Sequence, residues 1–98
     1  MTETSQSTEA DRQRFAAVGR ALADAKRLCV LESLAAGELS VSDLSVRVNC
    51  QVPNMSQHLA VLRSAGLVAT RREGSTIYYR LTDPQVLEAY RLIQQIAR

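Results

Sequence analysis

Apolar residues recur at intervals of three and four along most of the chain, and this spacing predicts amphipathic helices. Several helix ends are also marked in the sequence. Asp24 and Ser40 are typical N-cap residues, and Pro53 suits the first turn of a helix. Gly37 and Gly66 stand where glycine commonly ends a helix. The pattern therefore predicts five helices, over residues 9–22, 25–36, 40–48, 53–65 and 84–98.

The pattern changes to that of β-strands between the fourth and fifth expected helices. Residues 67–72 and 76–81 are rich in β-forming side chains, and Glu73-Gly74-Ser75 between them puts a glycine at the tip of a hairpin. A polar-faced helix followed directly by such a hairpin is a winged-helix arrangement. We therefore expect a mainly α fold with a β-hairpin wing, a winged helix-turn-helix in the order helix, helix, helix, helix, hairpin, helix.

Length and composition indicate a single globular domain. A chain of 98 residues with 46% apolar and 22% charged residues fits one ordinary domain. We expect residues 1–8, which are polar and rich in Ser and Thr, to be a disordered tail, and residues 9–98 to form the domain. No apolar run approaches membrane-spanning length, and the N-terminus lacks a secretory pattern. We therefore expect no membrane partner and a cytoplasmic location, where the two cysteines stay reduced.

The fourth expected helix separates apolar from polar residues. A start near Pro53 puts Met55, Leu59 and Leu62 on one buried stripe. Small hydrogen-bonding side chains and an arginine occupy the opposite side, which suits a helix that lies in a DNA major groove. We expect DNA bases to be contacted by Asn54, Ser56, Gln57 and His58, and a phosphate by Arg63. His58 has a second interpretation, which is packing against the N-terminal helix.

Charges are distributed unevenly along the chain, although the formal net charge is only +2. Residues 47–82 contain five arginines and a single acid, Glu73. A basic segment on a nearly neutral chain is typical of a face that contacts phosphate. We therefore expect the wing to contact double-stranded DNA through Arg71, Arg72, Ser75 and Thr76.

Patterns typical of enzymes and metal sites are missing from the sequence. The sole histidine has no cysteine at ligand spacing on its own helix, and Ser56 lies in no nucleophile elbow. The sequence also has no phosphate-binding loop. We therefore expect no enzyme activity, no cofactor and no bound metal. A winged-helix domain used only for protein contact is the alternative to DNA binding, but it gives less reason for the polar helix and the paired wing arginines.

Several blocks of the sequence resemble those of a known family over nearly the whole chain. The blocks are Ala21–Leu28, Gly37–Leu39, Met55–Leu59, Leu62–Arg63, Gly66–Val68, Arg71–Gly74 and Tyr78–Leu81. In this order and spacing they resemble the ArsR/SmtB family of bacterial winged-helix repressors. The resemblance implies that the third and fourth helices bind a near-palindromic operator. It also implies repression of a nearby operon until an inducer releases the protein.

The same resemblance implies a homodimer held together by the first and last helices. A second copy would also add apolar contact to a small core. The residues expected at the dimer interface are Phe15, Val18, Leu22, Leu87, Tyr90 and Ile93. A ligand pocket is the alternative interpretation of this stripe.

The sensing sites of the family do not transfer to this sequence. Ser40-Val41-Ser42 stands where many metal-sensing members have Cys-Val-Cys, and the last helix has no histidine. Glu32 stands where redox-sensing members have a cysteine. The remaining candidate sensors are Cys29 and Cys50, of which Cys50 is expected to be a small buried hydrophobe. A thiol-based repressor that responds to oxidants or thiophilic metals is therefore a further alternative, and the sequence does not identify the inducer.

Overall fold

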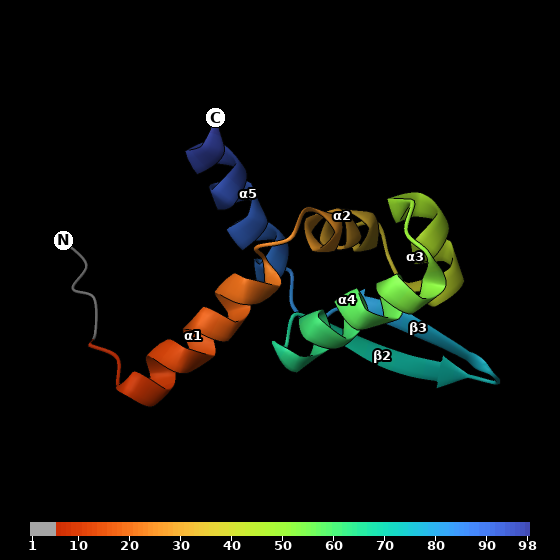
Figure 1. Cartoon of the computed structure of the whole chain (residues 1–98), viewed down its shortest axis with the longest axis horizontal. Coiled ribbons are helices and arrows are strands. Elements are labelled where there is room, and N and C mark those ends of the chain that lie inside the picture. The colour runs from red at the N-terminus through yellow and green to blue at the C-terminus, as the bar shows by residue number, and fades with distance from the viewer. Residues whose placement is uncertain (1–5) are drawn as a thin grey trace.

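A computed structural model describes residues 6–98 of the chain (Figure 1). Helices α1 and α5 project from a body formed by α2, α3, α4 and a small sheet. Within the described residues the elements are α1 (Glu9–Ala21), α2 (Ala25–Leu34), β1 (Leu39–Ser40), α3 (Val41–Val48), α4 (Val52–Ser64), β2 (Val68–Glu73), β3 (Thr76–Leu81) and α5 (Gln85–Ala97). The expected winged helix-turn-helix order is confirmed. No helix among residues 6–98 is long and apolar enough to cross a membrane.

Side-chain caps explain where three of the helices begin. The Asp24 carboxylate accepts hydrogen bonds from the backbone N–H groups of Lys26 (2.8 Å) and Arg27 (3.1 Å), and the Ser40 hydroxyl accepts one from Asp43 (3.1 Å). Both predicted N-caps are confirmed. Thr8, assigned from the sequence to the disordered tail, forms a capping box at the start of α1. Residues 1–5 of that expected tail lie outside the described residues.

The wing belongs to a three-stranded antiparallel sheet in the order β1-β3-β2. Strands β2 and β3 pair from Val68 opposite Leu81 to Glu73 opposite Thr76. The turn between them contains Gly74 at φ 62°, a left-handed conformation that favours glycine. Strand β1 pairs with β3 and was not predicted, because two residues are too short to show alternation.

The core joins α2, α3, α4 and the start of β2. Helical spacing groups Leu28 with Leu31 and Leu34 on one stripe and predicts its burial, but Leu28 is only half-buried and Val30 is in the core instead. The apolar stripe of α2 is therefore rotated relative to the one predicted from leucine spacing alone. The buried residues are Ala21, Val30, Leu31, Leu34, Leu44, Val48, Met55, Leu59, Leu62, Leu67 and Val68.

Candidate nucleic-acid interface

Helix α4 presents a polar surface to solvent. Burial of Met55, Leu59 and Leu62 fixes how the helix is rotated about its axis, because these residues lie on one stripe. The remaining positions then face outward. Four of the five candidate DNA-contacting residues of this helix are exposed, namely Asn54, Ser56, Gln57 and Arg63.

The first turn of α4 differs slightly from the prediction. The helix begins at Val52, one residue before the predicted start, and 48% of Val52 is exposed. The N-cap residue Gln51 makes no side-chain hydrogen bond to this turn. An uncapped helix N-terminus carries partial positive charge and attracts anions such as phosphate. The sequence prediction began the helix at Pro53, so it did not include Val52 among the candidate DNA-contacting residues. The neighbouring Pro53, which suits a first helical turn, was the one sequence signal that Val52 could belong to the helix.

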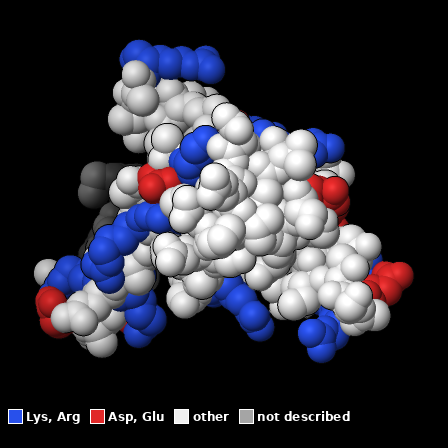
Figure 2. Space-filling view, turned by 45° about the vertical axis from the view of Figure 1, so that its right-hand side comes forward, with Lys and Arg blue, Asp and Glu red and all other residues white. Residues whose placement is uncertain are grey.

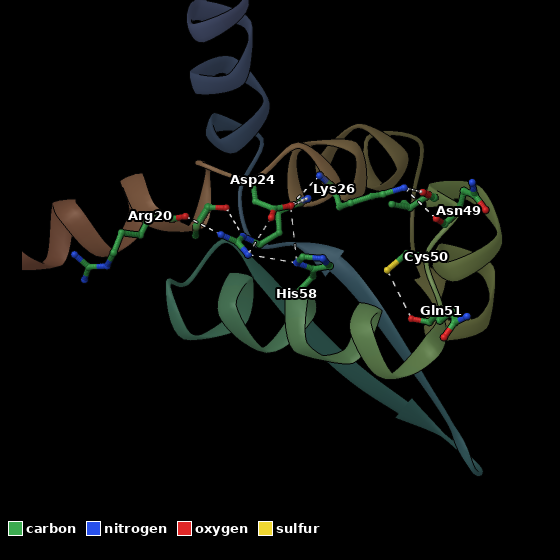
Figure 3. Close-up of polar contacts among 10 residues, drawn as sticks. Arg20, Asp24, Lys26, Asn49, Cys50, Gln51 and His58 are labelled. Carbon is green, nitrogen blue, oxygen red and sulfur yellow. Dashed lines mark hydrogen bonds and ion pairs between the residues drawn. The ribbon is translucent and has the colours of Figure 1, made fainter.

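His58 points away from the exposed surface of α4 and toward the turn between α1 and α2 (Figure 3). Its side chain is only 20% exposed. The imidazole Nδ1 lies 3.3 Å from Arg27 Nη1 and 3.9 Å from Asp24 Oδ1. His58 is therefore less exposed than the other candidate DNA-contacting residues of α4, although it lines one groove together with Asn54 and Gln57. This orientation favours the interpretation in which His58 packs between helices.

Three residues at the start of α2, Asp24, Lys26 and Arg27, form a polar cluster that we call the α2 junction. Arg27 donates hydrogen bonds to the carbonyl oxygens of Arg20 (2.9 Å) and Ala21 (2.8 Å) at the end of α1. Hydrogen bonding by the Arg27 backbone N–H lowers the pKa of the Asp24 carboxyl, and the charges of His58 and Arg27 act in the same direction. The junction therefore connects α1, α2 and α4.

Lys26 extends the α2 junction to the helix-turn-helix. Its ammonium donates to the carbonyl oxygens of Val48 (2.9 Å) and Asn49 (3.0 Å), where α3 ends (Figure 3). Asn49 has a left-handed backbone conformation, φ 54°, which terminates α3. These contacts span more than twenty residues, so helical periodicity gave no sign of them.

The two wing arginines have different environments. Arg71 pairs with Glu38 and Glu73 and stacks over the Tyr78 ring, with 4.7 Å between the guanidinium carbon and the ring centroid. Hydrogen bonds to Glu73 and Glu38 raise the pKa of Arg71. Arg72 is exposed, and no carboxylate among the described residues pairs with it. The structure therefore leaves Arg72 as the freer of the two cations.

The other expected wing residues lie beside the start of α3. Ser75 is exposed and Thr76 is half-buried. Together with Ile77 and residues 40–42 they line a shallow groove between the wing tip and α3. Figure 2 shows Lys and Arg side chains projecting separately around the edge of the visible face, with no continuous basic patch at its centre. Any phosphate contact from this face would therefore depend on individual arginines.

Apolar side chains remain uncovered on α1 and α5. Phe15 is 57% exposed and Ile93 is 37% exposed, whereas the other four expected interface residues are half-buried. Within the single chain α5 has no buried residue. Leu92 and Ile96, on the same helix, are also exposed. Large uncovered apolar faces of this kind are typical of surfaces that bind another protein.

A side-chain hydrogen bond joins helix α5 to α2. The Tyr90 hydroxyl donates to Glu32 Oε2 at 2.5 Å. This bond raises the pKa of Tyr90, and desolvation acts in the same direction. Glu32 stands at the position where the family resemblance led us to look for a cysteine, so this position is occupied by a structural carboxylate.

Both cysteines are free and half-buried against the core. Cys50 is therefore more accessible than expected, and its thiol lies 3.6 Å from the Gln51 carbonyl oxygen. Within residues 6–98, no group of three or more His, Cys, Asp and Glu side chains is arranged to hold a metal ion.

Comparison with known proteins gives consistent results. Residues 24–70 match the family model described as "Bacterial regulatory protein, arsR family". The HTH-type transcriptional regulator KmtR of Mycobacterium tuberculosis is 55% identical over 69 residues, which are 70% of this chain and 53% of KmtR. The transcriptional activator HlyU of Vibrio cholerae is 40% identical over 77 residues, which are 79% of this chain and 71% of HlyU. The chain thus spans about half the length of KmtR.

A solved structure matches almost the whole fold. It is the homodimeric winged helix-turn-helix DNA-binding domain (fragment 1–100) of Mb0332 from Mycobacterium bovis, a possible ArsR-family transcriptional regulator. The two structures superimpose with a TM-score of 0.85 at 36% sequence identity, over 99% of this chain and 90% of that one.

Proposed function

Because the chain belongs to the arsR family of bacterial regulatory proteins, we propose that it is a DNA-binding transcriptional regulator. We further infer that it represses a nearby operon until an inducer releases it, as its resemblance to the ArsR/SmtB repressors implies. The proposal depends chiefly on one observation, the exposed polar surface of α4 next to the wing. A domain used only for protein contact would not require hydrogen-bonding side chains at these positions. The relatives are transcriptional regulators rather than enzymes.

In this proposal α4 lies in the major groove as the recognition helix. Asn54, Ser56 and Gln57 contact base edges, and Arg63 contacts a phosphate. The exposed methyl groups of Val52 add an apolar surface that suits the 5-methyl group of thymine. His58 receives no base contact, because its ring faces Arg27 and Asp24.

The wing contacts the DNA backbone beside the recognition helix. Arg72 and the Ser75 hydroxyl supply phosphate contacts from the exposed edge of the hairpin. Arg71 contributes less while Glu38 and Glu73 neutralise its charge. Thr76, which is half-buried beside the groove, orients the hairpin tip.

We further propose that two copies of the chain associate through the apolar faces of α1 and α5. Exposure of Phe15 and Ile93 in the single chain supports this arrangement. A two-fold dimer presents two recognition helices to successive major grooves, which lie about 34 Å apart on one side of the duplex. The operator is then nearly palindromic.

The test is selection of binding sites from a pool of random DNA duplexes, followed by titration of the enriched duplex. We expect a near-palindromic sequence to be enriched. The Gln57→Ala variant should lose about 1–3 kcal/mol of binding free energy on that sequence and much less on scrambled DNA. Absence of any enriched sequence would contradict the proposal and favour the protein-contact alternative. An equal loss on both duplexes would remove Gln57 from the recognition surface.

A further inference from the structure

The α2 junction connects the proposed dimer helix to both helices of the proposed DNA-binding element. Arg27 holds the last carbonyl groups of α1 and also contacts His58 of α4. From the same turn of α2, Lys26 holds the end of α3. Four helices therefore meet through side chains of one short segment (Figure 3).

The Arg27 side chain is suited to hold a fixed geometry. Its side chain is only 16% exposed, and three of its nitrogen atoms each have a partner, namely the carbonyl oxygens of Arg20 and Ala21 and the His58 ring. A guanidinium is planar, so contacts from three of its nitrogens fix the orientation as well as the distance of the elements that they join. A lysine at this position has a single ammonium nitrogen, so it cannot fix the orientation of its partners in the same way.

Apolar packing between α1 and α4 is incomplete. A groove of about 320 Å³ lies between the two helices and is lined by Ala17, Arg20, Ala60, Val61, Ser64 and Ala65. Because small side chains line this groove, α1 packs against the body mainly near its C-terminal end, where Ala21 is buried and Val18 packs against the core. The polar contacts of Arg27 and His58 lie beyond the groove, where α1 ends.

We propose that Arg27 and His58 are positioning residues that fix the angle of the recognition helix relative to the dimer helix, and thereby set the spacing between half-sites that the dimer accepts. The inference rests on the proposed function, because half-sites exist only for a DNA-binding dimer. Lys26 supports the same geometry by holding the end of α3. Neither Arg27 nor His58 touches the DNA in this arrangement.

The test separates positioning from base contact and from simple stability. It uses the enriched operator, versions with the half-sites moved apart or together by one and two base pairs, and a duplex with one half-site scrambled. Wild-type protein should prefer one spacing strongly. Arg27→Gln should lose about tenfold in affinity on the full operator, keep its half-site affinity and bind all spacings more equally. Arg27→Lys should have an operator affinity and a spacing preference between those of the wild type and of Arg27→Gln.

Arg12→Gln is the matched control. Like Arg27, Arg12 donates to a backbone carbonyl oxygen and pairs with a carboxylate, but its partners Ser7 and Glu9 lie at the start of α1. It should keep the wild-type spacing preference. If Arg27→Gln does not fold, as judged by circular dichroism, His58→Leu decides the question, since it removes the α4 contact and leaves the bonds of Arg27 to α1 in place.

An unchanged spacing preference in the folded variants would overturn the inference. So would equal losses on half-site and full operator, which would indicate base contact or general destabilisation. These results differ from failure of the proposed function itself, in which no operator sequence is enriched and wild-type protein shows no preferred spacing.

Discussion

Arg71 lies with its guanidinium Nε 2.8 Å from both carboxylate oxygens of Glu38, a residue 33 positions earlier in the chain. Glu73 adds a second carboxylate contact to the same guanidinium. An arginine on the proposed DNA-facing wing is therefore already occupied by acids of its own chain. In DNA binding, phosphate has to compete with these carboxylates for Arg71.

Glu38→Gln should raise the affinity for DNA of any sequence. Loss of the Glu38 charge makes Arg71 more available to phosphate, and each additional phosphate contact steepens the plot of log affinity against log salt by about 0.9. Titrations at several salt concentrations measure this slope. Glu88→Gln is the control, because Glu88 carries the same charge but pairs with Arg91 within α5. Equal slopes for the two variants would show that Glu38 does not compete with DNA.

Arg72→Ala should weaken binding to operator and random DNA alike. It should flatten the slope of log affinity against log salt by about 1.8, because each of the two chains of the dimer loses one phosphate contact worth about 0.9. Arg71→Ala should flatten it less, because Arg71 is already paired with carboxylates. The double variant Arg71→Ala/Arg72→Ala should show the largest change. If Arg71→Ala flattens the salt dependence as much as the double variant does, phosphate displaces Glu38 from Arg71 on binding.

Val52→Ala should abolish discrimination between thymine and uracil at one position of each half-site. Deoxyuridine lacks only the 5-methyl group, so its substitution for thymidine isolates the apolar contact. Wild-type protein should bind the uracil operator more weakly, and Val52→Ala should bind both operators equally. Val46→Ala is the control, because Val46 is 82% exposed but belongs to α3. Loss of discrimination in the control, with none in Val52→Ala, would assign the contact to α3.

Ile93→Asp should produce a folded monomer with low affinity for the full operator. Ile93 is not part of the core of the single chain, so a charge at this position acts mainly on the proposed dimer interface. Sedimentation measures the mass, and circular dichroism reports folding. Gln95→Asp adds the same charge at an exposed position on the opposite side of α5 and should remain dimeric. A monomeric Ile93→Asp variant with full operator affinity would refute the dimeric arrangement.

Cys29→Ser and Cys50→Ser should each bind operator normally and respond to metals and peroxide as the wild type does. Each thiol is free and packs against the core. Dissociation from operator under increasing peroxide, zinc or arsenite measures the response. A serine variant that stays on DNA where the wild type dissociates would identify that cysteine as the sensor.

Local patterns in the sequence predicted most of the fold. Periodicity located the five helices and the wing, and Asp24 and Ser40 marked two helix starts correctly. The contacts that modify the candidate site join residues far apart in sequence. His58 meets Arg27, and Arg71 meets Glu38, only after the chain has folded. Helical spacing carries no information about such partners. The sequence therefore left open whether His58 contacts DNA or packs between helices, and it did not distinguish the two wing arginines.

The uncovered faces of α1 and α5 also bear on how the regulator would respond to its own abundance. Because α5 buries no residue within a single chain, association of two chains stabilises this helix as well as the pair. Below the dimer dissociation constant, the concentration of DNA-binding dimer then rises with the square of the chain concentration. Operator occupancy would therefore change more steeply with the amount of protein synthesised than it would if a single chain bound the DNA.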